Sequence, residues 1–304
     1  MKKIYRVLYA PLFWFGFIGL GIWSVGYLAA PWWTLIVLAL AAIFVSLLSE
    51  YWIPYQADWN GNQRDMPRDI AHAFINESSN AVSLMLWGSL LVVVSTLFPS
   101  TGWWPSNWPV WLQVTLAILV ADAGITLAHY ASHQLGFLWR LHAVHHSVTR
   151  MYGFNGLMKH PLHQAIEGAA GLGPLLLLGM PAPIAAILGY AIAINLLLQH
   201  SNVDVKVGAL RYIFAWAPVH RFHHIRYGKA GDVNFGFFTN VWDYLLGTTF
   251  YTDQYRITTT DLGIGSRPDF PVRYISQLIE PFRPQTSSAA PQTPMALKNL
   301  GIGN

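Results

Sequence analysis

The hydrophobic residues of this chain run together in three long uncharged stretches separated by polar segments. No Asp, Glu, Lys or Arg occurs in 7–49, 78–121 or 168–203. About 20 apolar residues suffice to cross a bilayer as a helix, so each stretch can hold one or two membrane-spanning helices. The pattern predicts an all-α integral membrane protein.

Clusters of Pro, Gly and Trp divide these stretches into elements. Breaks at 29–33 and 98–109 split the first two stretches into two spans each, and the tryptophans of the second break favour a membrane interface. The third stretch is interrupted at 179–183 and forms either two short spans or a re-entrant hairpin. We therefore expect about four transmembrane helices plus a further apolar hairpin. The expected spans cover approximately 11–30, 33–52, 80–98 and 110–128.

The positive charges share one side of the predicted topology. If the spans alternate, all 18 Lys and Arg residues lie on the side of the N-terminus, and the two intervening turns carry none. The positive-inside rule makes that side cytoplasmic, facing the cytosol from the inner or plasma membrane in a bacterium and from the endoplasmic reticulum in a eukaryote. The same asymmetry explains the net charge of +4 without a nucleic-acid partner. The first apolar run lacks a small-residue cleavage site, so we expect a retained span and not a signal peptide.

The composition of the chain excludes all cysteine chemistry and indicates where the folded domain ends. Hydrophobic residues make up 54% of the chain and charged residues 11%, and there is no cysteine. Disulfides, thiolate metal ligands and cysteine-bound iron–sulfur clusters are thereby excluded. We expect one membrane-embedded domain over 1–283. The Pro-, Ser- and Thr-rich tail, 284–304, is expected to be disordered.

Eight of the 12 histidines fall in three short clusters. Histidines at i, i+3 and i+4 lie on one helix face, and neutral imidazole is the commonest metal ligand in proteins. An HxxxH cluster directs two rings to one point. An HxxHH cluster directs two and leaves the third angled aside, free for a second metal. A lone histidine is more often structural, but three clusters at ligand spacing predict a polyhistidine metal site in a helical cap: His129 and His133; His142, His145 and His146; His220, His223 and His224.

Asp122 lies inside the fourth predicted span, on one helix face with Thr126, His129 and His133. Ionisable residues in a membrane span are costly and indicate function. We expect its carboxylate to bond the free N–H of a metal-binding imidazole or to be an additional ligand. The alternative is a snorkelling or helix-paired aspartate.

The remaining histidines have weaker signals. His200 ends the last apolar stretch and is a candidate ligand, with Asp204 four residues later as a possible supporting group. His160 and His163 flank Pro161, so a helix start is expected there, and both are possible additional ligands. His72 is expected to be structural or to lie at the rim of the site.

Taken in order, these elements resemble the fatty acid hydroxylase/sterol desaturase superfamily of membrane-bound metal oxygenases. Asp122 lies seven residues before the HxxxH cluster, and the first HxxHH cluster follows. The resemblance covers about 45–252. Its later elements are His160-Pro161, His200-Ser-Asn202, the second HxxHH cluster, Asn234-Phe-Gly236 and Trp242 to Thr248.

The resemblance implies a cytosolic histidine-bound centre of two iron ions, with zinc possible in the isolated protein. It implies O2-dependent hydroxylation of an unactivated C–H bond in a membrane lipid. Some members have a second histidine where this chain has Asp204, and a carboxylate often follows the His-Pro element, where this chain has His163. The implied ligands are His129, His133, His142, His145, His146, His200, His220, His223 and His224.

The sequence is compatible with other functions. Lipid desaturation uses the same site. A membrane haem protein would pair histidines across spans, and a metal transport or binding protein would carry ionisable residues near the middle of several spans. The chain has no dinucleotide-binding motif that joins a strand to a helix, so electrons are expected from a separate reductase with a ferredoxin or cytochrome. Acyl chains, sphingolipids, sterols, ether lipids and ornithine lipids all remain possible substrates, and the oligomeric state is open.

Overall fold

The computed structural model describes residues 1–98 and 103–302, and within these ranges it contains helices and loops but no β-strand. Positions 99–102 of the predicted tryptophan-rich turn, and 303–304 of the tail, lie outside the described residues. The all-α prediction is confirmed for the described part of the chain.

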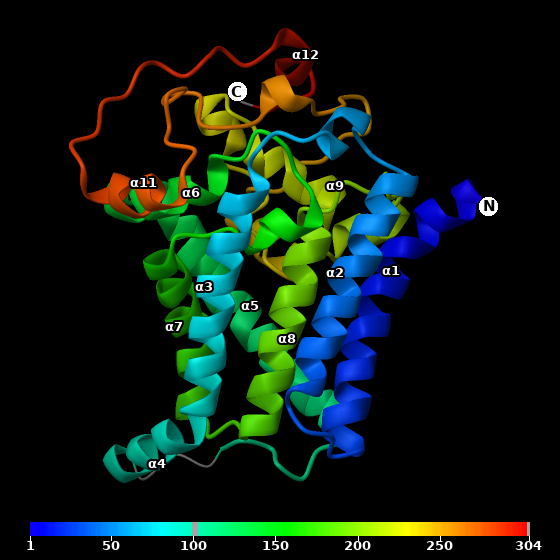
Figure 1. The fold of residues 1–304 in the computed structure, drawn as a ribbon, viewed down its shortest axis with the longest axis vertical. Coiled ribbons are helices and arrows are strands. Elements are labelled where there is room, and N and C mark those ends of the chain that lie inside the picture. The colour runs from blue at the N-terminus through cyan, green and yellow to red at the C-terminus, as the bar shows by residue number, and fades with distance from the viewer. Residues whose placement is uncertain (99–102, 303–304) are drawn as a thin grey trace.

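Long helices run side by side and form the membrane part of the fold (Figure 1). Four of them are long and apolar enough to cross a bilayer, the first being α1 with its π-helical extension Ile22–Tyr27. Two further helices, α3 (Met66–Met85) and α7 (Pro161–Leu177), lie beside them. The four candidate spans are α1 (Lys2–Gly21), α2 (Thr34–Trp52), α5 (Val110–Gln134) and α8 (Ala182–Gln199).

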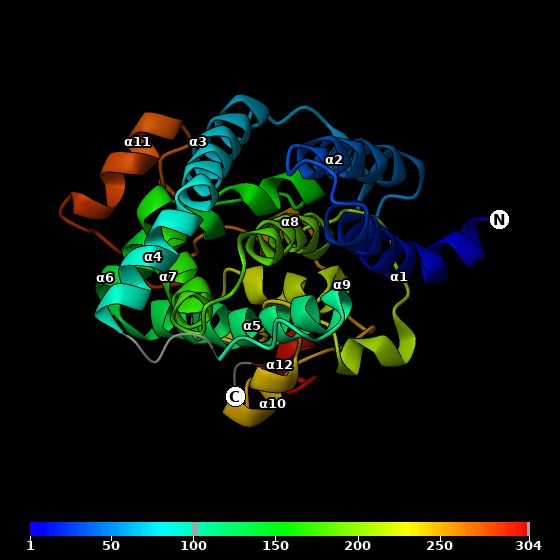
Figure 2. The ribbon, with the colours of Figure 1, turned by 90° about the horizontal axis from the view of Figure 1, so that it is seen from below.

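Helix α8 is the centre of this bundle. Seen from below, it is surrounded by the other long helices, and it packs against α1, α2, α3 and α5 (Figure 2). Its sequence is apolar on every face from Ile184 to Ile194, as a helix that is covered on all sides requires. The polar residues at its end, Asn195 and Gln199, therefore point into protein, and both side-chain amides donate to the backbone carbonyl of Phe237.

The predicted number of spans is confirmed, but their identities differ from the prediction. The span expected at 80–98 has other bounds: α3 begins at Met66, and after Met85 the chain bends by 52° into α4 (Trp87–Leu97), so that the two helices are long and apolar enough to cross a bilayer only when they are taken together. Polar residues such as Asp69 and Asn76 belong to this helix because they find buried partners in the cap. The apolar hairpin expected at 168–203 is the α7–α8 pair, and only α8 qualifies as a span.

The cap covers one end of the bundle, the end at which α1 begins (Figure 1). It has its own apolar core, which includes Trp59, Met151 and Phe222. Leu297 and Ile302 belong to this core, so part of the segment expected to be disordered is packed here, while the domain limit at 283 stays a prediction. The cap helices are α6 (Gly136–His146), α9 (Ala217–His220), α10 (Val241–Leu246), α11 (Tyr274–Ile279) and α12 (Met295–Lys298).

Helices α5 and α7 approach closely at Gly124. A Cβ atom at this position would overlap the carbonyl group of Ala170 and the Cα of Gly171. Because backbone lines the other side, no side chain can move aside to relieve the overlap. The contact fixes α7, which carries two polar side chains of the site described below.

Substituting Gly124→Val is therefore expected to separate the two helices and destabilise the fold by at least about 1–3 kcal/mol. The measurement is the thermal unfolding midpoint in detergent. Gly168→Val is the matched control, because no atom outside its own helix lies within 4 Å of a Cβ there. An equal midpoint for the two variants would contradict the prediction.

Candidate metal centre

The first two histidine clusters come from α5 and α6, which meet at a sharp corner. His129 and His133 lie on consecutive turns at the end of α5. Leu135 is extended and ends that helix, and α6 begins at Gly136 in a new direction. The last turn of α6 then carries His142, His145 and His146 back over the end of α5, where all three are buried.

The third cluster is formed by a much shorter helical segment. Helix α9 ends at His220, and a 3-10 turn, Arg221–His224, continues it. These two turns suffice to set His220 and His224 on one face. His200 directly follows α8, so the central helix of the bundle also contributes to the site.

The structure brings all nine predicted ligands into two groups, in each of which the ligand atoms lie within 4.8 Å of one another. Group one is His129, His133, His142, His146 and His223; group two is His145, His200, His220 and His224. The first HxxHH cluster contributes His142 and His146 to group one and His145 to group two. The second contributes His220 and His224 to group two and His223 to group one.

The separations within each group match a shared metal ion. In group one, His146 Nε2 lies 3.0 Å from the Nε2 atoms of both His142 and His223. In group two, the Nε2 atoms of His220 and His224 are 3.1 Å apart. Two nitrogens bound to one metal at about 2.0–2.1 Å are separated by roughly 2.9–3.4 Å. Each group could therefore hold one metal ion.

The strongest sign of a cation in group one is the pair His129 and His223. Their Nδ1 atoms lie 2.9 Å from the carbonyl of Phe235 and 2.8 Å from that of Val233. A carbonyl only accepts, so both Nδ1 atoms carry the proton, and both Nε2 atoms present lone pairs. These Nε2 atoms are 2.8 Å apart and cannot bond each other. A metal ion between them would be bound by both lone pairs and would remove this repulsion.

Group two contains a pair of the same kind. His145 donates from Nδ1 to the carbonyl of Met158 at 2.9 Å, and His200 donates to Oδ1 of Asn155 at 3.0 Å. Asn155 is oriented by its own amide, which donates to the carbonyl of Arg150. The two Nε2 lone pairs again face each other, at 3.2 Å. Both groups thus fit a metal ion by the same criterion.

The two carbonyls that accept from His129 and His223 belong to a tight turn centred on Asn234. This residue has φ 54°, a left-handed conformation that asparagine tolerates better than most residues. Its side chain accepts from Phe250 N–H and donates to the Val219 carbonyl, which fixes the turn. As a result, Val233 and Phe235 on either side direct their carbonyls to two different histidines.

Burial keeps the cap histidines neutral. The pKa values of His145, His146, His223 and His224 are held well below their usual range, chiefly by burial and also by neighbouring imidazoles. Burial lowers the pKa of His200 to about 3. At neutral pH these rings are unprotonated, which is the form that binds metals.

Asp122 is buried, but among the described residues none of its hydrogen bonds goes to a histidine. It accepts from the backbone N–H of Phe238, the hydroxyl of Thr239 and the indole N–H of Trp242, at 2.7, 2.6 and 3.2 Å. The prediction that Asp122 bonds an imidazole directly is therefore wrong. Asp122 instead holds the loop that follows the carbonyl of Phe235.

Three other candidates lie away from the two groups. His160 caps the start of α7 and contacts the Leu278 carbonyl, and Asp204 pairs with Arg6 at 3.0 Å. Neither belongs to a ligand group in the described part of the chain, so their suggested metal roles are not supported. His72 bonds the Lys159 carbonyl and Gln277, which is a structural position.

His163 lies at the margin of group one, and the sequence reasoning missed its partner Glu167. His142, His163 and Glu167 form a third, smaller cluster of possible ligand atoms. The carboxylate of Glu167 pairs with Lys159, and both side chains are buried and line a small cavity beside group one. The spacing of His163 and Glu167, i and i+4 on one helix, was the available signal.

The fold and site together define a membrane protein with two polyhistidine groups. The family model for fatty acid hydroxylase matches residues 114–248. The chain is 33% identical over 251 residues to ornithine lipid hydroxylase OlsE of Rhizobium tropici, covering 81% of this chain and 75% of that protein. The chain belongs to the fatty acid hydroxylase/sterol desaturase superfamily. The resemblance seen in the sequence is thereby confirmed.

Two relatives that match a smaller part of this chain are named as lipid monooxygenases. Alkylglycerol monooxygenase of Danio rerio is 32% identical over 148 residues, which cover 48% of this chain and 31% of that protein. Sphinganine C4-monooxygenase 2 of Arabidopsis thaliana is 27% identical over 139 residues, covering 45% and 53%. No solved structure gives a significant match.

Proposed function

We propose that this protein hydroxylates an unactivated C–H bond of a membrane lipid with O2, at a centre of two iron ions. The observation that carries the proposal is the convergence of nine imidazoles in two groups, with the lone pairs of His129 and His223 facing each other at 2.8 Å. The three relatives described above are all named hydroxylases or monooxygenases, which favours oxygen insertion over desaturation.

The chain itself supplies position and environment. Iron bound by the two groups would provide the redox chemistry that activates O2. The carbonyls of Phe235, Val233 and Met158 hold three rings in the tautomer that leaves Nε2 free. Leu196 and Phe237 line the cavity beside the histidines and make part of its wall apolar.

An ornithine-type lipid is the substrate we propose. The support is the alignment with the ornithine lipid hydroxylase, which extends over three quarters of that protein, well beyond the histidine clusters. The buried ion pair of Lys159 and Glu167 lines the cavity. Such a pair offers one partner for a carboxylate and one for an ammonium group, and an amino-acid head group carries both.

We also propose that the histidine groups face the cytosol. They lie at the end of the bundle where α1 starts (Figure 1), and the first turns of α1 carry Lys2, Lys3 and Arg6. The positive-inside rule assigns such an end to the cytoplasm. Hydroxylation consumes one O2, two electrons and two protons, and releases one water. A reductase with a ferredoxin or cytochrome would deliver the electrons from that side.

The test is expression in a bacterium that makes ornithine lipid but has no hydroxylase for it. Lipid extracts analysed by mass spectrometry are expected to contain ornithine lipid heavier by one oxygen, and growth under 18O2 is expected to label that oxygen. His146→Ala should abolish the product. A product lighter by two hydrogens would identify a desaturase, and oxygen derived from water would refute the mechanism.

A further inference from the structure

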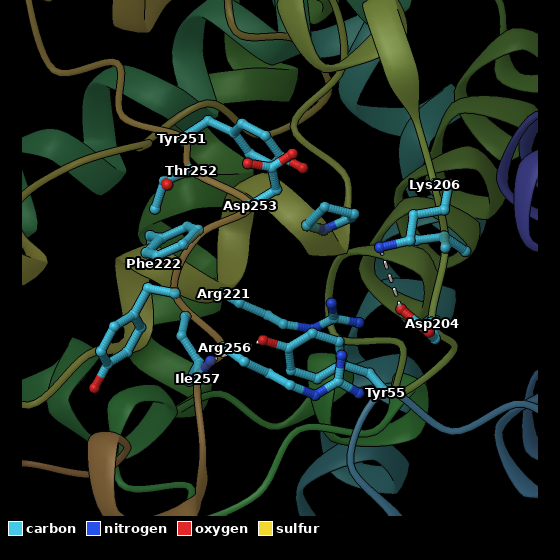
Figure 3. A pocket seen from close by; sticks show the side chains of 13 residues that line it. Tyr55, Asp204, Lys206, Arg221, Phe222, Tyr251, Thr252, Asp253, Arg256 and Ile257 are labelled. Carbon is cyan, nitrogen blue, oxygen red and sulfur yellow. Dashed lines mark hydrogen bonds and ion pairs between the residues drawn. The ribbon is translucent and has the colours of Figure 1, made fainter. Parts of the chain in front are cut away.

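A second pocket lies on the cap, has no histidine of the two groups in its lining, and has no part in the proposed reaction. It is partly open to solvent, and its empty volume of about 480 Å³ includes this open part (Figure 3). Its walls come from four separate parts of the chain: the loop after α2, the segment 204–206, the stretch 218–222 of α9 and the 3-10 turn that follows it, and the segment 251–257. Cationic side chains gather in it: Lys206, Arg221 and Arg256.

Two of these cations share one aromatic ring. The guanidinium carbons of Arg221 and Arg256 lie 3.9 and 4.2 Å from the ring centre of Tyr55. Figure 3 shows both side chains beside this ring. Stacking on an aromatic ring holds a guanidinium in place while its edge stays available for hydrogen bonds. Two neighbouring guanidinium groups of like charge favour an anion between or beside them.

Arg221 carries unused hydrogen-bonding capacity although it is only 2% exposed. One terminal nitrogen, Nη2, donates to the carbonyls of Ser201 and Val203. Its Nε is buried and has no hydrogen-bond partner within the described residues. An unpaired N–H of a buried charged group is costly, so a ligand that accepts from it would be strongly favoured.

The two carboxylates of the pocket do not cancel this charge. Asp204 is already paired with Arg6 at 3.0 Å and lies 4.0 Å from Lys206. Asp253 is exposed. The lining therefore remains positive and suits an oxyanion, for which the fork of an arginine is the best match in proteins.

The pocket also lies at the level where the membrane helices end. Arg6, the partner of Asp204, is in the first turns of α1, and its carbonyl accepts from Lys206 N–H. Tyr55 follows the end of α2 at Trp52. Tyr51, Trp52 and Tyr212 are exposed nearby in the chain, as aromatic residues at a membrane interface are. Lipid phosphate groups lie at this level.

We propose that this pocket binds a phosphate group, presented by the head group of a membrane lipid. The guanidinium groups of Arg256 and Arg221, which both line the pocket, donate to its oxygens, and Lys206 adds charge. Free phosphate offers the same chemistry, and the experiment below separates the two sources. The proposal is independent of which lipid is hydroxylated.

The test uses the full chain purified in dodecyl maltoside, which contains no phosphate. Inorganic phosphate is titrated at constant ionic strength, and the thermal unfolding midpoint is followed by tryptophan fluorescence. Binding raises the midpoint of the native protein. We expect Arg256→Gln to weaken the apparent affinity about tenfold and Asp253→Asn to tighten it a few-fold, because one removes an attraction and the other a repulsion. Arg273→Gln, an exposed residue with the same charge change, should have no effect.

A second arm adds phosphatidylglycerol or a phosphate-free galactolipid to the micelles. The proposal is supported if phosphatidylglycerol raises the unfolding midpoint, whether or not inorganic phosphate also raises it, and the galactolipid does not. A rise with inorganic phosphate alone keeps the phosphate site but assigns it to a soluble anion. The proposal is overturned if neither source shifts the midpoint, if Arg256→Gln responds like the wild type, or if Asp253→Asn weakens binding.

Discussion

Two double substitutions of histidine are expected to leave different amounts of iron bound. His145→Ala with His220→Ala should retain about one iron per chain, because both rings belong to group two and group one stays complete. His145→Ala with His146→Ala should retain almost none, because these adjacent residues belong to different groups. Metal analysis of protein purified from iron-replete cells gives the ratio of iron to chain, which should be about two for the wild type.

The control for this experiment is His160→Ala, since His160 lies outside both groups and should leave the iron content unchanged. All hydroxylation should be lost in both double variants. If each HxxHH cluster held its own metal, the outcome would be reversed: the adjacent pair would keep one iron and the separated pair none. Stoichiometric haem, or iron content that no variant alters, would refute the metal centre altogether.

Asp122→Ala is expected to damage both the fold and the metal site, although within the described residues Asp122 forms no hydrogen bond with a histidine. The substitution leaves buried donors of Phe238, Thr239 and Trp242 unpaired, at roughly 1–3 kcal/mol each. The same loop carries Phe235, whose carbonyl orients His129. Loss of such indirect support typically lowers metal affinity by about 10–100-fold.

Two measurements check this prediction: the thermal unfolding midpoint of the metal-free protein, and iron retention against a chelator of known affinity. Asp58→Ala, which removes an exposed carboxylate, is the matched control and should change neither. If Asp122→Ala lowered iron retention with no change in the midpoint of the metal-free protein, the carboxylate would act on the centre and not through the loop.

The sequence determined the features that depend on neighbours along the chain. A bilayer requires about 20 apolar residues in a row, so the helices around Thr34 to Trp52 and Val110 to Gln134 were visible in the hydrophobic pattern. Likewise, the helical repeat of 3.6 residues places His142 and His146 on one face whatever surrounds them. These local rules predicted an all-α membrane protein with a cluster of histidines at one end.

The same rules failed where a residue's partner is distant in the chain. Helix α3 begins at Met66, before its apolar part, because Asp69 bonds Tyr152 and His72 bonds Gln277 in the cap. A prediction from the hydrophobic pattern alone ends the helix at such polar positions. Only packing shows that their polar groups are satisfied.

Tertiary structure alone also decided how the site is divided and supported. His129 meets His223 across 94 positions of sequence, and the carbonyl that orients it comes from Phe235, 106 positions away. Backbone carbonyls occur at every residue, so no residue type marks the ones that hold an imidazole. Glu167 joins the site for a similar reason: Gly124 lets α7 lie against α5, and that contact brings the carboxylate beside the histidines. The sequence specifies these contacts only through the packing of the whole fold, because each depends on backbone positions that distant segments set.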